Sequence, residues 1–354
     1  MPGRGNENFQ LQRNDMSSSP DFLSLPHGSL HWNPELVQRW TDLAPQSGKP
    51  DPFSCTPAWQ LAFHDAFAPS RRLLIEEEEG NLMAFAEMAL PSGRIIFVPV
   101  ESHWISGCPL LGAEAEELLV RFFRRILQSP GAVPPAFLIS GMERGSTLLL
   151  RLYQKLGRFC RFLEQPLSLQ RCASLEGGMD GYLSRRSANF RSKMKKARRK
   201  ALEQGVVFER HTPLSPEEAD RLYSRMLAVE EQSWKGRDHC GMTETPSREF
   251  YHAMIRRLSL YGGARVMFAT HEGRDIGFIF GGMAGPYYRG QQFSYAADWK
   301  AFSIGDLLQM EQILQLCDEG AVRYDMGMSD HPSMAYKSHW AEQEQVLQAV
   351  VLLP

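Results

Sequence analysis

The chain has 354 residues, 43% of them hydrophobic and 23% charged, with a formal net charge of −2 at pH 7. This length predicts two domains or one large one, and the composition is ordinary for a globular protein. A charge this close to zero excludes a general electrostatic attraction to nucleic acid or membranes, so any such attraction must come from a local patch.

The cysteine pattern and the hydropathy indicate the cellular compartment in which we expect the protein. The six cysteines are scattered and form no CxxC pair, which indicates reduced thiols and neither a disulfide framework nor a zinc site. No apolar run approaches the roughly 20 residues of a membrane helix, and the polar N-terminus lacks the apolar centre of a signal peptide. We therefore expect a cytoplasmic protein without a metal or a transmembrane segment, and a disordered tail over residues 1–24.

Residues 25–172 are expected to form an N-terminal domain of helices and strands. Thr56 and Pro57 suit the N-cap and the first position of a helix. Apolar periodicity predicts further helices over residues 31–43, 114–127 and 146–156. Turn residues and β-type composition predict strands over residues 72–78, 82–90, 94–99, 136–140 and 167–172.

Residues 173–354 are expected to form a second domain. A very basic helix is predicted over residues 181–204, and Ser215 with Glu218 forms the capping box of a helix over residues 215–234. A further helix is predicted over residues 248–261. Strands are predicted over residues 206–211, 264–271, 275–283, 287–296, 322–326 and 346–353.

The two halves run in a similar order, with a hairpin around a Glu-Gly turn in each. These hairpins lie in residues 75–85 and 268–278. The pattern suggests a structural repeat, although one shared hairpin can arise by chance. A mixed sheet with flanking helices makes each half an α/β or α+β domain.

A polar loop over residues 300–306 leads from a strand into a helix, and such a helix mouth is a ready anion site. Backbone N–H groups of Ser303, Ile304 and Gly305 would face the anion, and Lys300 would add positive charge. Asp306 would repel a phosphate, or instead stabilise the start of the helix. The alternative is an ordinary turn capped by Ser303 or Asp306.

The order of these pieces resembles the Gcn5-related N-acetyltransferase (GNAT) superfamily. The resemblance is sharpest in the second half, through the basic helix of residues 182–205, the segment 230–236, the hairpin at Gly277, the loop at Gly305 and the ending 324–337. In the first half it covers residues 52–59 and the Glu-Gly hairpin. The chain is most similar to the tandem-domain branch with CelD-like and BioF2-like acetyltransferases, and more distantly to the Fem aminoacyltransferases.

This resemblance implies a fold of two tandem GNAT-like domains, each a mixed, mostly antiparallel sheet flanked by helices. The first domain would be degenerate and the second would bind acetyl-CoA or another acyl-CoA, with no metal. The pyrophosphate would lie at the helix mouth formed by Lys300, Ser303, Ile304, Gly305 and Asp306. The usual superfamily loop carries an Arg or Gln followed by two close glycines, whereas only Gly305 stands here.

Three residues are candidates for acid–base chemistry. The resemblance implies that Tyr295, on the strand before the loop, protonates the leaving thiolate, although an aromatic core residue is the alternative. Glu231 is predicted to accept the proton of the acceptor amine, and its alternative is a solvated helix face. Asp325, at a strand end, is a second candidate base or a group that orients the acceptor, with a capped strand end as the alternative.

Three residues are expected to contact substrate. Trp234 follows the candidate base closely in the sequence. The resemblance implies that Tyr336 and Lys337 lie near the donor or the acceptor. Lys337 is expected either to neutralise phosphate or to pair with Asp325.

The basic helix stands out in a chain of nearly zero charge. Its cationic side chains are Arg185, Arg186, Arg191, Lys193, Lys195, Lys196, Arg198, Arg199 and Lys200. They favour an anionic partner, which could be tRNA, a glycan or a membrane surface, and the alternative is a solvated face. We therefore expect an acyl-CoA-dependent acyltransferase acting on a small molecule, sugar or peptide. The rivals are a Fem-like transferase using aminoacyl-tRNA and a non-catalytic accessory protein of polysaccharide biosynthesis.

Overall fold

The structure is a computed structural model that describes residues 33–128, 133–329 and 332–354. The tail expected over residues 1–24 lies outside this part. Helices lie at α1 Pro34–Gln46, α2 Pro57–Phe67, α3 Ala115–Leu127, α4 Thr147–Leu156, α5 Gly178–Ser184, α6 Ala188–Glu203, α7 Pro216–Gln232, α8 Trp234–Arg237, α9 Ser247–Ser259 and α10 Ile304–Asp318. Short 3-10 helices lie at η2 Phe53–Cys55, η3 Ala297–Phe302 and η4 Pro332–His339.

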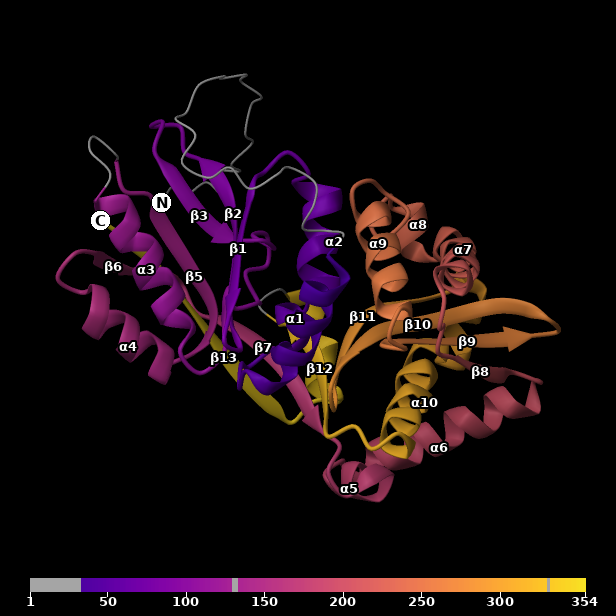
Figure 1. Ribbon diagram of the computed structural model, residues 1–354. Helices are drawn as coiled ribbons and strands as arrows, with labels where there is room; N and C mark the ends of the chain where they lie inside the picture. Colours follow the sequence, from indigo (N-terminus) through magenta and orange to yellow (C-terminus); the bar gives the residue numbers. More distant parts are fainter. Residues whose placement is uncertain (1–32, 129–132, 330–331) are drawn as a thin grey trace, which may run out of the picture.

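The strands form one sheet that runs through the whole molecule (Figure 1). Its main path is β1-β2-β3-β5-β13-β7-β12-β11-β10-β9-β8, and among the described residues only the β3–β5 and β11–β12 pairs are parallel. The strands are β1 Leu73–Glu78, β2 Asn81–Ala89, β3 Ile95–Pro99, β4 Leu110–Leu111, β5 Ala136–Glu143, β6 Arg161–Glu164, β7 Ser168–Ser174, β8 Val207–His211, β9 Ala264–His271, β10 Arg274–Ala284, β11 Tyr287–Tyr295, β12 Arg323–Met328 and β13 Gln343–Leu353. The expected mixed, mostly antiparallel sheet flanked by helices is confirmed.

The strand order contains an internal repeat. Strands β1, β2, β3 and β5 in one half correspond to β9, β10, β11 and β12 in the other, each set an antiparallel hairpin, a third strand and a helical crossover to a parallel fourth strand, and β8 is added at the C-terminal edge. Both hairpins turn on two residues with positive φ, Glu79–Gly80 and Glu272–Gly273, as tight two-residue turns do.

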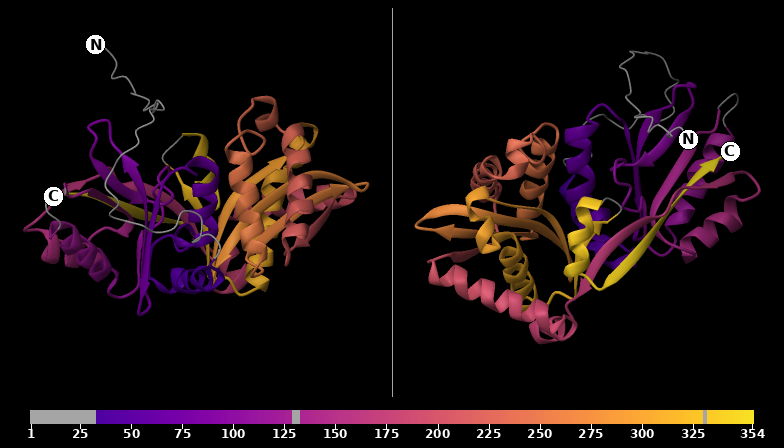
Figure 2. Two further views of the ribbon diagram at one scale, coloured as in Figure 1. Left: turned by 45° about the horizontal axis from the view of Figure 1, so that its top comes forward. Right: turned by 180° about the vertical axis from the view of Figure 1, so that it is seen from behind.

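The last strand of each half is exchanged. Strand β7 pairs with β12, and the C-terminal strand β13 pairs with β5 and β7. Figure 2 shows β13, in yellow, lying along the N-terminal half. The boundary expected between residues 172 and 173 falls inside β7, and the domain assignment stays a prediction.

Helices cover both faces of the C-terminal half of the sheet (Figure 1). Helix α10, with α5 and α6 beside it, packs on one face, and α7 and α9 pack on the other. We call these the α10 face and the α7 face. Helix α2 from the N-terminal half joins the core on the α7 face, where Trp59 and Phe63 pack against Phe250 of α9.

Local capping explains where several helices begin. The Thr56 side chain accepts from Trp59 N, and Ser215 accepts from Glu218 N, as the sequence predicts. The single basic helix expected over residues 181–204 is wrong, because the chain forms α5 and α6 with a break between them. Ser187 causes the break by capping α6, since its Oγ accepts from Phe190 N at 3.1 Å.

Candidate functional site

Strands β11 and β12 pair over only a short length. The parallel register joins Tyr287 to Arg323, Tyr288 to Tyr324 and Arg289 to Asp325. Beyond this point β11 continues to Tyr295 and β12 to Met328 without pairing to each other. We call these diverging segments, residues 290–295 and 326–328, the splay.

Two β-bulges lie at the start of the splay and explain it physically. On β11, Gln291 is the extra residue, because Phe280 pairs with Gln292 and Gly281 with Gly290. On β12, the register with β7 shifts between Asp325 and Gly327. A bulge bends its strand and increases the local twist, so a bulge on each strand turns the two strands apart.

The N-terminus of α10 presents free backbone donors. The amides of Ile304, Gly305 and Asp306 donate no hydrogen bond within the described part of the chain. The Ser303 amide, expected among the free donors, already donates to Lys300 O at 3.2 Å. Ser303 itself has a left-handed backbone with φ of 57°, and Lys300 is exposed beside it. The N-terminus of α10 can therefore bind an anion through three amides, but Asp306 takes the place that the sequence analysis gave to Ser303.

Gly305 brings this helix mouth against the end of β11. A Cβ on Gly305 would lie 2.9 Å from Cε1 of Tyr295 and 3.4 Å from Cε2 of Phe293. The close approach therefore requires glycine. Tyr295 is half-buried, and its ring packs on the α10 face beside Ile304. The free amides thus lie next to one strand of the splay.

The basic helix α6 runs beside α10. Lys193 pairs with Asp306 at 3.0 Å, and Arg198 pairs with Glu311. Lys200 lies over the Phe302 ring at 4.4 Å and donates to Ala301 O at 3.4 Å. Asp306 therefore has a cationic partner, which offsets the repulsion that its carboxylate would exert on a phosphate.

On the α7 face, β11 meets a polar cluster that sequence analysis did not select. Glu230 is fully buried, and its carboxylate accepts from the Ser294 hydroxyl and from Met242 N. Glu231, the predicted base, is exposed on α7. Helical spacing alone could not choose between adjacent glutamates, because the choice depends on which side of α7 meets β11.

Lys235 is the second member of this polar cluster. Its Nζ donates to Phe293 O at 2.8 Å and to Gln292 Oε1 at 3.0 Å. Burial lowers the pKa of Lys235, and the negative charge of Glu230 opposes this. One sequence signal pointed to this polar cluster: the side-chain period of two along β11 places the polar residues Gln292 and Ser294 on the same face of the strand.

Asp325 lies buried at the start of the splay. Arg323 contacts both of its carboxylate oxygens, at 2.8 and 2.9 Å. Burial raises the pKa of Asp325 to about 6, although Arg323 acts in the opposite direction. Nearby Asp51 is also fully buried and accepts hydrogen bonds from Ser54 and Gln170.

The predicted substrate contacts lie in different places. Tyr336 of η4 packs its ring on Phe293 of β11, with centroids 5.9 Å apart, so η4 lies against the splay. Lys337 is buried and donates to Met328 O at 2.6 Å. Trp234 of α8 is 57% exposed. Tyr295, Tyr336, Lys337 and Asp325 are therefore on or beside the two diverging strands, whereas Trp234 and Glu231 lie on the outer surface next to the buried Glu230.

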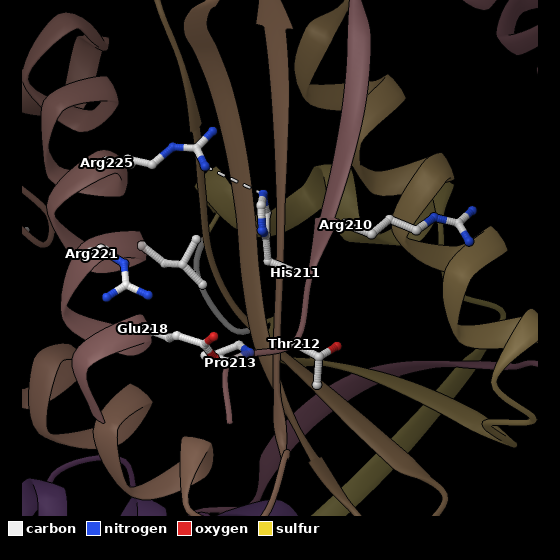
Figure 3. A pocket seen from close by; sticks show the side chains of 8 residues that line it. Arg210, His211, Thr212, Pro213, Glu218, Arg221 and Arg225 are labelled. Carbon is white, nitrogen blue, oxygen red and sulfur yellow. Dashed lines mark hydrogen bonds between the residues drawn. The ribbon is translucent and has the colours of Figure 1, made fainter. Parts of the chain in front are cut away.

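A separate hollow of about 430 Å³ lies between β8 and α7, at the outer edge of the sheet (Figure 3). Arg210, His211 and Arg221 are among its lining residues. Arg210 pairs with Asp318 and Arg225 with Asp275 and Glu209, so these two charges are already compensated. No residue of α10 or β11 lines this hollow.

The described residues hold no group of three or more His, Cys, Asp or Glu side chains arranged to bind a metal ion. Over the same residues, no helix combines the length and the apolar character that crossing a membrane requires.

Comparisons with solved structures agree on the fold. A protein of unknown function from Bacteroides thetaiotaomicron VPI-5482 is 10% identical with a TM-score of 0.63, over 90% of this chain and 96% of that one. FemX is 12% identical with a TM-score of 0.61, over 88% and 95%. The C-terminal domain of a putative lysylphosphatidylglycerol synthetase from Agrobacterium fabrum is 12% identical with a TM-score of 0.55, over 90% and 91%.

No curated protein sequence matches the chain. Residues 188–338 match the family described as Acetyltransferase (GNAT) domain, and this range spans α6, the splay and the mouth of α10. Residues 188–338 are therefore a GNAT-type acetyltransferase domain, the segment of the chain to which this match extends.

Proposed function

We propose that this protein is a cytoplasmic acyl-CoA-dependent acyltransferase that acylates an amine or hydroxyl of a small molecule, sugar or peptide. The observation that carries the proposal is the set of free amides of Ile304, Gly305 and Asp306 beside a strand that diverges from its neighbour. The amides suit a pyrophosphate, and unpaired strand edges suit the amide-containing arm of a CoA thioester. Lys300 and Lys193 would add positive charge near the phosphates.

The reaction we propose is direct transfer. The acceptor nitrogen or oxygen attacks the thioester carbonyl carbon, the C–S bond breaks, and the acceptor loses a proton. Asp325 is our candidate base, because a buried carboxyl with a pKa of about 6 suits proton transfer near neutral pH. Tyr295 is the candidate acid for the leaving thiolate, and the exposed Glu231 is an alternative base. Trp234, Tyr336 and Lys337 are proposed acceptor contacts.

We further propose that the N-terminal half, residues 25–172, is a degenerate GNAT-like domain that shapes the acceptor site, and that residues 173–354 form the catalytic domain. The buried Asp51 supports this division of labour, because it comes from the first half and lies near Asp325 at the start of the splay. Membership of the CelD-like and BioF2-like branch is part of the same proposal.

The test is a thermal-shift panel of CoA, acetyl-CoA and longer acyl-CoAs, combined with an assay of thiol release. Two substitutions separate shape from charge. Gly305→Ala adds a Cβ against Tyr295, whereas Gly305→Asp adds the same Cβ and a carboxylate. We expect CoA to raise the melting temperature of the wild type, and Gly305→Asp to lose more of this shift than Gly305→Ala. If CoA raises the melting temperature of both variants as much as that of the wild type, the donor site lies elsewhere.

A Fem-like transferase that uses aminoacyl-tRNA is the second candidate function. The observation that favours it is α6, in which seven of 16 residues are Lys or Arg and one is acidic. This helix lies beside the α10 mouth, and FemX shares the fold. Binding of tRNA that weakens steeply with salt, and that a Lys195→Glu/Lys196→Glu variant loses, would favour this function over CoA.

The non-catalytic alternative has its own signature. A polysaccharide-biosynthesis accessory protein would release no thiol from any acyl-CoA and would not be stabilised by CoA. Stabilisation by CoA together with turnover on any acceptor would exclude it.

A further inference from the structure

Arg289 occupies the last paired position of β11, where the splay begins. Its side chain is 7% exposed and lies flat against Gly327 of β12. A Cβ on Gly327 would lie 2.5 Å from Nη1 of Arg289, and Gly327 has φ of 78°. The guanidinium therefore reaches from one diverging strand to the other.

This guanidinium is poorly satisfied for a buried charge. Within the described residues it donates no hydrogen bond, and its Nε and Nη1 are buried without a partner. Its nearest counter-charge is Asp51, whose Oδ2 lies 3.7 Å from Nη2. Asp51 already accepts from Ser54 Oγ at 2.8 Å and from Gln170 at 3.0 Å. Buried charges in proteins are ordinarily both paired and hydrogen-bonded, whereas Arg289 has a counter-charge but no hydrogen bond within the described residues.

A neighbouring arginine shows what a structural role looks like here. Arg323 contacts both oxygens of Asp325 and donates to Pro50 O at 2.7 Å.

A second unpartnered donor lies close to Arg289 in the chain, because the Nε2 atom of the bulged Gln291 is also buried without a partner. The start of the splay thus gathers donors, one of them cationic, that the protein itself leaves unused.

We propose that Arg289 anchors a carboxylate of the ligand that occupies the splay. A guanidinium presents a planar set of N–H donors that matches a carboxylate, and the low-dielectric surroundings strengthen the contact. The carboxylate can belong to the acyl group of the donor or to the acceptor. This inference rests on the proposed function, because it assumes that the splay is the site of acyl transfer.

Matched probes distinguish the two sources. In the donor arm, succinyl-CoA and butyryl-CoA share a four-carbon acyl group and differ in the terminal carboxylate. In the acceptor arm, amino acids are compared with their amides in the presence of CoA. A third arm uses succinate and succinamide with the protein alone, so it is independent of CoA. Each pair is measured by thermal shift and calorimetry, and the first two also by KM.

The variants are Arg289→Gln, Arg289→Lys and a matched control, Arg265→Gln. Arg265 is also largely buried, but it pairs with Glu319 and donates to Gly262 O, away from the splay. We expect wild-type protein to prefer the carboxylate member of at least one pair by about ten- to 100-fold. Arg289→Gln should lose this preference, Arg265→Gln should keep it, and Arg289→Lys should keep part of it.

Stability separates this role from a structural one. A guanidinium that makes no hydrogen bond contributes little to folding, so Arg289→Gln should melt within a few degrees of the wild type, whereas Arg323→Gln should melt clearly lower. Equal response to both members of every pair, or a preference that persists in Arg289→Gln, would overturn the inference. Absence of any CoA response would instead overturn the proposed function, and the succinate arm would still decide the role of Arg289.

Discussion

Trp59 joins the two halves of the protein, and its truncation tests whether they fold as one unit. This residue of α2 is 4% exposed and packs against Phe250 of α9, with ring centroids 5.2 Å apart. It also contacts Trp104 at 5.3 Å and Phe53 at 6.1 Å. Its indole Nε1 donates to Glu101 Oε2 at 3.3 Å. Removing the ring therefore removes packing between α2 and the GNAT domain.

The expected cost of Trp59→Ala follows from these contacts. Truncation of a buried tryptophan to alanine destabilises a protein by about 3–5 kcal/mol. Truncation also removes the Trp59 donor from Oε2 of the buried Glu101, while Oε1 keeps three backbone donors, the amides of His103, Trp104 and Ile105. We therefore expect a loss of about 4 kcal/mol, near the middle of that range.

Urea unfolding followed by both fluorescence and circular dichroism measures this loss. The wild type and Trp59→Ala should each unfold in one transition that both probes report together. Trp234→Ala is the matched control, because this tryptophan is 57% exposed and its removal should cost less than about 0.5 kcal/mol. A cost below 1 kcal/mol for Trp59→Ala, or two separate transitions, would refute the reasoning that the α2–α9 contact couples the halves.

Three further predictions follow from buried groups. Burial raises the pKa of Asp325 to about 6, so between about pH 4 and 6 the folded protein holds a proton that the unfolded chain has lost. The free energy of unfolding should therefore fall as pH rises through this window. Asp325→Asn should remove up to about 3 kcal/mol of this pH dependence, measured by urea unfolding at several pH values. Burial raises the pKa of Cys160 to about 11 and of Cys172 to about 12, so a thiol reagent should titrate the exposed Cys240 first, and Cys240→Ser should abolish that fast phase. Gly282→Ala would place a Cβ 2.2 Å from the Phe53 ring, and it should lower the free energy of unfolding by about 1–3 kcal/mol; an unchanged value would mean that the ring can move freely.

Local features of the fold could be predicted from the sequence, because they depend on neighbouring residues. The Thr56 and Ser215 caps and the two Glu-Gly hairpins are examples. The helix mouth at Gly305 also lies where the loop pattern indicated. In each case a few adjacent side chains or a positive φ determine the backbone, so the signal is contained in a short stretch.

Features that depend on distant partners could not be predicted in the same way. The sequence shows that β7 and β13 are strands, but not that each pairs with the opposite half. The two bulges are also invisible, because a bulge is a mismatch between two strands and not a property of one. The polar cluster of Glu230 and Lys235 could not be predicted for a related reason, because its members meet β11 only through long-range contacts, to Ser294 and to Phe293 O.

The exchange of strands bears directly on the splay. A strand that leaves its parallel neighbour exposes a row of backbone groups on that edge, and it needs support on the other edge to stay ordered. Strand β12 obtains this support from β7, which pairs with it antiparallel from Arg323 to Met328, past the point where β11 departs. Because β7 precedes the GNAT domain of residues 188–338 and also pairs with β13, one wall of the splay is built on a strand outside that domain. A fragment limited to residues 188–338 should therefore keep the free amides of α10 in its sequence but lose the geometry that places β12 beside them.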